Sequence, residues 1–337
     1  MAQTLFDKIW NEHIVSRSSG FPDTLYIDTH FINKVTSPGA FDGLRERDMH
    51  VFRAKQTHVL HEQESKSLIP TSDPICFQLD VFNKNCSDFG IEMATQQVKY
   101  DGRILASPGQ TIVCDPDHTG NLGAFGVIAI GIKQAQVEQV LAFQSLFIQK
   151  PKTMKIEVNG KLRKGLGAKD INHHLISEIS SGGARGYFIE FGGDTILSLD
   201  MRDRMEICNI GREIGAEGGI IAPDELTFDY LKERGLAEKT GIDEDHLDFW
   251  KTLFSDESSV FDEVLEFDAE DIMPGTYVIG ASKKLNSESF KQGPVSYDLT
   301  GIIEGYNDTE YIISQKGSIE VFERSQAYKT FNGVNSL

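Results

Sequence analysis

One stretch of the chain, residues 107–132 (SPGQTIVCDPDHTGNLGAFGVIAIGI), limits the choice of fold more than any other. A Pro-Gly turn leads into a short apolar strand from Thr111 to Cys114, and a polar loop follows that strand. After the loop, small and apolar residues predict a helix that begins near Gly123. In α/β folds, ligands bind where strands end, and anions bind where helices begin. The stretch therefore predicts an α/β fold with ligand-binding groups in the loop.

Other segments supply further helices and strands. In TLFDKIWNEHIV, apolar residues recur at helical spacing from Leu5 to Ile14, which predicts a surface helix packed on a core. Residues 73–93 also follow a helical pattern. The segment KTMKIEVNGKL alternates as a strand does and ends in Asn159-Gly160, a pair that is typical of a β-hairpin. Short strand-like pieces occupy residues 301–337.

The charge balance excludes several classes of partner. The chain has 337 residues, a formal net charge of −18 and no dense run of Lys or Arg, so we expect neither nucleic acid nor an anionic membrane to bind. A small anion stays compatible with this charge because it needs only a few local donors. The longest apolar run, residues 124–132, is shorter than the roughly 20 residues of a membrane span. The chain also begins without a signal-peptide pattern, and we expect a cytoplasmic protein.

Four cysteines, Cys76, Cys86, Cys114 and Cys208, are too scattered for a disulfide framework, and no two of them form a CxxC pair. A structural zinc or an iron-sulfur cluster usually takes at least two ligands from one short loop. We therefore expect buried and chemically inert thiols.

The order of several motifs resembles the large subunit of 3-isopropylmalate dehydratase, in the aconitase superfamily. The similarity runs from about Thr4 to Asp268. The motifs are TLFDKIW, LYIDTHFINKVTSPGAFDGLR, KNCSDFGI, PGQTIVCDPDHT followed by GAFG, PKTMKIEVNGKL, GYFIEFGG, MEICNIGREIGAEGGIIAPDELTFDYL and FWKTLFSDE. The resemblance implies an aconitase-like α/β/α layered domain with a mixed sheet over residues 1–270, and a divergent β-rich segment follows over residues 271–337.

For active members, the resemblance also implies a four-iron four-sulfur cluster that holds the substrate's hydroxyl and carboxylate during dehydration and rehydration. It implies a separate small subunit or domain as well. The family's three cluster cysteines lie in a CTNSR-type loop and a closely spaced pair, and neither motif occurs in this chain. After about Met273 only PGTYVIGAS resembles the family. We therefore expect no iron-sulfur cluster on this chain alone and predict no cofactor.

The resemblance assigns site positions one at a time. The family's GDSHT loop corresponds to residues 115–119, where His118 and Thr119 match while Pro116 and Asp117 replace the family's Asp and Ser. Where the family has Asp-His, this chain has Glu62-Gln63, with His61 beside them. Gly39 replaces a Gln expected near the substrate. Asn209 and Glu213 match residues that hydrogen-bond near the cluster's reactive iron.

Physical arguments are compatible with some of these positions but leave a structural role open. Carboxylates close to the His118 imidazole suit general acid/base chemistry near neutral pH, although a loop histidine that caps a helix would look alike. Asn209 and Glu213 are four residues apart, so in a helix they share one face, as an ordinary surface pair also would. We predict as catalytic residues His118, Asp117, Glu213 and Glu62. We predict as substrate-binding residues Asn209, Thr119, Asp115, Arg212 and His61.

A mononuclear divalent metal is the remaining cofactor hypothesis, because imidazole and carboxylate groups suit iron, manganese or zinc. No two histidines show a ligand-type spacing, so we assign no metal ligand. The residues concerned are His61, Glu62, Asp117, His118 and Glu213.

Three functions stay open. The leading hypothesis is a cluster-free enzyme that acts on a small carboxylate-bearing molecule by lyase, isomerase or cyclase chemistry. The second is a pseudoenzyme or non-catalytic subunit that binds a metabolite or a partner chain. The third is half of a split 3-isopropylmalate dehydratase. The oligomeric state stays open between a homo-oligomer and a small-subunit-like partner, because a domain without its family partner exposes a face that another chain would cover.

Overall fold

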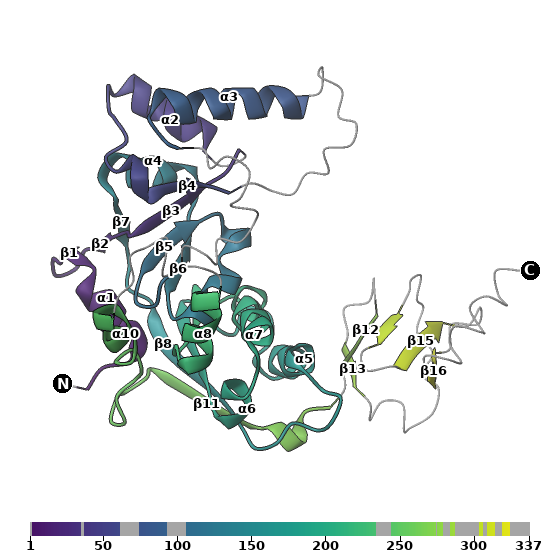
Figure 1. Cartoon of the computed structure of the whole chain (residues 1–337). Helices are drawn as coiled ribbons and strands as arrows, with labels where there is room; N and C mark the ends of the chain where they lie inside the picture. Colours follow the sequence, from purple (N-terminus) through teal and green to yellow (C-terminus); the bar gives the residue numbers. More distant parts are fainter. Residues whose placement is uncertain are drawn as a thin grey trace, which may run out of the picture.

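The computed structural model describes residues 2–34, 37–60, 74–92, 106–233 and 244–273, together with the backbone of five short strands between residues 275 and 323 (Figure 1). Two four-stranded parallel sheets form the centre of the molecule. The first sheet consists, in order, of β4 (Thr57–Val59), β3 (Thr29–Ile32), β5 (Thr111–Cys114) and β6 (Ile128–Gly131). The second consists of β10 (Gly218–Ile221), β9 (Tyr187–Gly192), β8 (Lys152–Asn159) and β11 (Glu263–Asp268).

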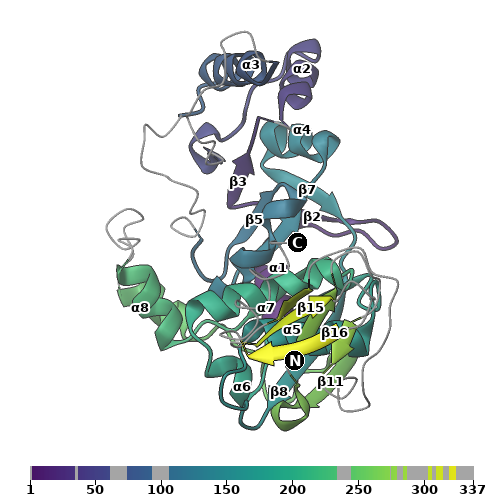
Figure 2. The same ribbon diagram turned by 90° about the vertical axis from the view of Figure 1, so that its right-hand side faces the viewer.

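Helices pack around both sheets and produce the expected α/β arrangement. Near the first sheet lie α2 (Pro38–Glu46), α3 (Pro74–Asp88) and α4 (Gln134–Phe143). Near the second sheet lie α1 (Leu5–Glu12), α5 (Ala168–Ile179), α6 (Asp194–Leu197), α7 (Met201–Glu213) and α8 (Glu225–Glu233). Trp250, at the end of α10 (Glu244–Trp250), contacts Phe228 of α8. The view in Figure 2 shows α7 below β5, where the two sheets meet.

Two antiparallel sheets complete the fold. The smaller consists of β1 (Ile14–Ser16), β2 (Asp23–Tyr26) and β7 (Ser145–Ile148). The other confirms the β-rich C-terminal segment and consists of β13 (Lys284–Asn286), β12 (Gly275–Val278), β14 (Ile303–Gly305), β15 (Thr309–Ile313) and β16 (Ile319–Glu323). The division of the chain at residue 270 stays a prediction. No helix in the described part of the chain combines the length and apolarity that crossing a bilayer demands.

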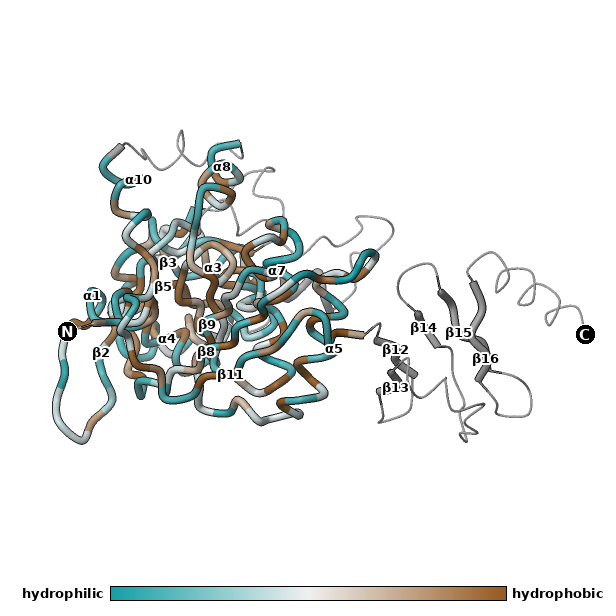
Figure 3. The backbone as a smooth tube through the Cα atoms, turned by 90° about the horizontal axis from the view of Figure 1, so that it is seen from below, coloured by the Kyte–Doolittle hydropathy of each residue, from teal (hydrophilic) through white to brown (hydrophobic). Residues whose placement is uncertain are grey.

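The core lies within and between the parallel sheets. Ile112, Val113 and Cys114 of β5 are fully buried, as is Ile128 of β6. Strands covered on both faces carry continuous apolar runs, and the hydrophobic stretches in Figure 3 follow these strands. The buried strand predicted at Thr111–Cys114 is therefore confirmed, as are the helices predicted from residues 5–14 and 73–93.

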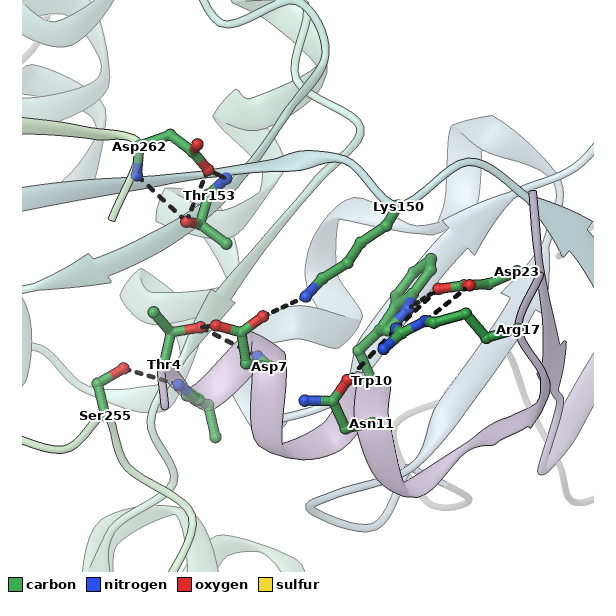
Figure 4. Close-up of polar contacts among 11 residues, drawn as sticks. Thr4, Asp7, Trp10, Asn11, Arg17, Asp23, Lys150, Thr153, Ser255 and Asp262 are labelled. Carbon is green, nitrogen blue, oxygen red and sulfur yellow. Dashed lines mark hydrogen bonds and ion pairs between the residues drawn. The ribbon is translucent and has the colours of Figure 1, made fainter. Parts of the chain in front are cut away.

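Helix α1 is held to distant parts of the chain by polar contacts that are buried or half-buried, several of which Figure 4 shows. The Leu5 amide donates to Ser255 Oγ at 2.7 Å, and this hydroxyl donates to Glu190 Oε2 at 2.7 Å. At the other end of the helix, Trp10 Nε1 donates to Asp23 Oδ2 at 2.9 Å. Burial raises the pKa of Glu190, although the Ser255 hydrogen bond opposes that rise. These contacts connect α1 to the second sheet and to β2.

Two local predictions were wrong. The helix expected near Gly123 is a short 3₁₀ segment, η4 (Gly120–Phe125), followed by strand β6, in which Ile128 lies opposite Thr111 of β5. Periodicity cannot distinguish a short buried strand from a buried helix. The hairpin expected at Asn159-Gly160 is absent, since β8 pairs in parallel with both β9 and β11. Asn159 Oδ1 instead accepts a hydrogen bond from the Asp194 amide at 3.1 Å.

Candidate functional site

The candidate site lies where the strands of the first sheet end. Because β3, β4, β5 and β6 are parallel, the loops that follow them begin at one edge of the sheet. The loop after β5 contains residues 115–119 and the 3₁₀ turn η3 (Pro116–His118). The loop after β4 leads toward His61 and Glu62, two predicted site residues that lie outside the described part of the chain.

The loop after β5 is held by its own hydrogen bonds. The Asp117 amide donates to Asp115 Oδ1 at 3.0 Å, and the His118 amide donates to the Asp115 carbonyl at 2.9 Å. Thr119 Oγ1 donates to the Pro116 carbonyl at 3.1 Å. The Asp-Pro pair thus starts a tight turn, and the turn fixes the backbone from which the His118 side chain extends.

Asp115 provides the carboxylate that lies next to the imidazole. Asp115 Oδ1 is 3.9 Å from His118 Nδ1, and the side chains of the two residues are only 15% and 23% exposed. The separation exceeds hydrogen-bond distance, so Asp115 lies beside the imidazole without fixing its tautomer. An imidazole and a carboxylate are nevertheless the groups that general acid/base chemistry uses.

Helix α7 packs directly on the segment that follows this loop. A Cβ on Gly120 would lie 2.1 Å from Asn209 Oδ1, and a Cβ on Gly123 would lie 1.7 Å from the Gly219 carbonyl oxygen. Both positions therefore require glycine, since any side chain would push η4 away from α7 or β10. The close approach places Asn209, half-buried on α7, beside the beginning of η4.

An ion pair joins the loop to the end of α7. Arg212 Nη1 donates to Asp117 Oδ1, and the two side chains are 54% and 77% exposed. Arg212 lies in the last turn of α7, where the helix dipole favours a cation. The structure therefore brings the loop residues Asp115, Asp117 and His118 together with Asn209 and Arg212, which was expected only from the resemblance.

A buried arginine on α7, Arg204, was not predicted from the sequence. Arg204 is fully buried, and its Nη1 and Nη2 donate to the two carboxylate oxygens of Asp224 at 2.8 and 2.6 Å. Burial opposes the charge on Asp224, but the hydrogen bonds from Arg204 outweigh that effect and lower the pKa of the carboxyl. The sequence carried one sign of this buried position. Arg204 shares helical spacing with the apolar residues Met201, Met205 and Cys208, which face the core.

The described cysteines do not form a metal site. Cys86 lies on α3, Cys114 on β5 and Cys208 on α7, and each thiol is buried. Burial raises the pKa of all three, that of Cys86 to about 12, so none is ready to bind a metal as a thiolate. Within the described ranges, no three His, Cys, Asp or Glu residues cluster as metal ligands would.

Comparison with known proteins defines the class. The family model for the aconitase family (aconitate hydratase) matches residues 7–281. The chain belongs to the aconitase family.

Among the curated relatives, the 3-isopropylmalate dehydratase large subunit of Cytophaga hutchinsonii is 45% identical over 81% of this chain and 61% of its own length. The large subunit of the same name from Flavobacterium johnsoniae is 38% identical over 94% of this chain and 72% of its own length. Aconitase X of Thermococcus kodakaraensis, in a crystal structure of its holo-form, matches with a TM-score of 0.40 at 10% identity, over 74% of this chain and 58% of that one.

The chain thus spans 61% of the first of these relatives. Both relatives are named 3-isopropylmalate dehydratase large subunits. The suspected family and the α/β fold are confirmed.

Family membership overturns the prediction that no cofactor is involved. Active members carry a four-iron four-sulfur cluster, as the resemblance implied, and this chain is 45% identical to a curated member. The described residues nevertheless do not fit such a cluster, because their thiols are buried on three separate elements. We therefore derive no chemical step through a cluster on this chain.

Proposed function

We propose that this chain forms the substrate-facing part of a hydro-lyase for a small hydroxycarboxylate, and that the cluster ligands are supplied by a second polypeptide. This is the hypothesis of a split dehydratase, and it replaces the hypothesis of a cluster-free enzyme. It accounts for both the family membership and the unsuitable cysteines. A dehydration removes a proton from one carbon and a hydroxyl group from its neighbour, and the proton transfers are the part that this chain can perform.

One observation carries the proposal: the loop after β5 and helix α7 meet at the edge where ligands bind in α/β folds. His118 and Asp115 lie in the loop with little exposure, and Asn209 lies on the helix beside it. In the proposed reaction, His118 gives a proton to the leaving hydroxyl group, so that water departs. Asp115 lies beside the imidazole, and the Asn209 amide donates a hydrogen bond to the substrate.

Glu213 is the candidate for the opposite proton transfer. It is exposed in the last turn of α7 and lies four residues after Asn209, so the two residues share one face of the helix. We therefore assign Glu213 to the removal of the carbon-bound proton. Glu62 stays an alternative base.

Reconstitution tests the proposal. This chain would be combined anaerobically, with iron and sulfide, with the part of the Cytophaga hutchinsonii large subunit that it does not match and with that protein's partner subunit. We expect 3-isopropylmalate to be dehydrated, which is measured by the ultraviolet absorbance of the new carbon–carbon double bond. Replacement His118→Asn should lower kcat by about 10²- to 10⁴-fold.

Size-exclusion chromatography and the visible absorbance of the cluster show whether the parts have assembled. The control variant Lys169→Gln, on α5, should behave as the unchanged protein does. Assembly of a coloured complex without turnover would contradict the proposal, and so would a His118→Asn variant with full activity.

A further inference from the structure

Two arginines of α7 hold aspartates in different ways. Arg204 uses Nε, Nη1 and Nη2 to bind Asp224 and backbone carbonyls, and its side chain is fully buried. Arg212 contacts Asp117 through Nη1, and more than half of its side chain is exposed. The guanidinium of Arg212 is therefore accessible, and solvent reaches both members of its pair.

An exposed ion pair is exchangeable. Ion pairs in water contribute little to stability, since solvent screens them and both side chains lose freedom. Asp117 is 77% exposed, so its carboxylate can turn into solvent at little cost. A second carboxylate that reaches Arg212 would form the same kind of charge-assisted hydrogen bond, and a planar guanidinium can hold it with two N–H groups.

The location of this pair points toward the proposed site. Asp117 immediately precedes His118, and Arg212 is one helical turn after Asn209. An anion bound in place of the Asp117 carboxylate would thus extend between the imidazole and α7. The net charge of −18 disfavours anions over the molecule as a whole, so an anionic ligand needs a local cation of this kind.

We propose that Arg212 is the receptor for a substrate carboxylate, and that Asp117 occupies the guanidinium until the ligand displaces it. This inference rests on the proposed function in that it uses the same site, and it names the ligand class as small carboxylates. It also changes the role of Asp117. The sequence suggested a proton-transfer residue, whereas here Asp117 is a competitor that keeps Arg212 positioned and tunes affinity.

The test is isothermal titration of the purified full chain with succinate, and with succinamide as the uncharged probe. We expect the unchanged protein to bind succinate but not succinamide. Arg212→Gln should weaken succinate binding at least 10-fold, and Arg212→Lys should restore part of it. Asp117→Asn should strengthen binding several-fold, because the competing carboxylate is removed.

Arg202→Gln provides the matched control, since Arg202 is an exposed arginine in the first turn of the same helix. It should leave the affinity unchanged. The inference is overturned if succinate binds none of the proteins, if Arg212→Gln binds as the unchanged chain does, or if Asp117→Asn fails to gain affinity. Binding is measured without turnover or a partner, so a failed reconstitution would leave these results standing and would count against the proposed function alone.

Discussion

The two ends of helix α7 differ in what their arginines can do. At the beginning of the helix, the buried Arg204 is bound by both oxygens of Asp224. At its end, the exposed Arg212 shares one contact with the exposed Asp117. Both pairs join α7 to loops that follow parallel strands, β10 in the first case and β5 in the second. Burial therefore decides whether such a pair stabilises the fold or stays available to a ligand.

The largest effect should come from breaking the buried pair. Arg204→Met removes the hydrogen bonds to two backbone carbonyls and to Asp224, and should lower the free energy of unfolding by about 3 kcal/mol, measured by urea denaturation. The double variant Arg204→Met/Asp224→Leu should lose at least as much, because Asp224 also accepts the Thr227 amide at the start of α8. A single variant as stable as the unchanged protein would show that the two ends of α7 do not differ.

The packing that positions α7 is the next target. Gly123→Ala places a methyl group 1.7 Å from the Gly219 carbonyl oxygen. We expect the free energy of unfolding, measured by urea denaturation, to fall by about 1–3 kcal/mol. Gly192→Ala is the matched control, since nothing lies within 4 Å of a Cβ there. If both variants lost the same amount, the close approach of η4 to β10 would not be what holds the site together.

The sheet that carries the site loop should also respond to pH. His30 on β3 is fully buried, and burial lowers its pKa from 6.5 to about 3. Between these values the unfolded chain binds a proton that the folded chain does not, so stability should fall by up to about 1.4 kcal/mol per pH unit as the pH decreases below 6.5. His30→Leu should reduce this slope in urea denaturation measured from pH 7 to pH 4. An unchanged slope would contradict the assignment.

The smallest effect on stability should come from the exposed pair. Arg212→Gln should change the free energy of unfolding by less than about 1 kcal/mol, in contrast to Arg204→Met. The measurement is the same urea titration, run in parallel for both variants. A loss comparable to that of Arg204→Met would mean that Arg212 has a structural role, and the comparison between the two ends would fail.

Much of the fold could be predicted because it follows local rules. Helix α1 and strand β5 follow from periodicity, and the loop at residues 115–119 follows from a polar break between apolar runs. The hairpin prediction at Asn159-Gly160 failed because parallel pairing with β9 and β11 overrode the local turn signal.

The partners within the site could not be predicted in the same way. Asp117 and Arg212 are separated by 95 residues, and their contact depends on how α7 packs against η4. Sequence proximity suggested that both Asp115 and Asp117 act on His118. The folded loop turns Asp115 toward the imidazole and Asp117 toward α7. Only the tertiary structure separates these two roles.

A crystal structure of the chain with 3-isopropylmalate tests the central claim most directly. The account predicts a ligand carboxylate within about 3 Å of the Arg212 guanidinium, with the Asp117 side chain turned away and the ligand hydroxyl facing His118. A ligand bound elsewhere, with the Arg212–Asp117 pair intact, would contradict it.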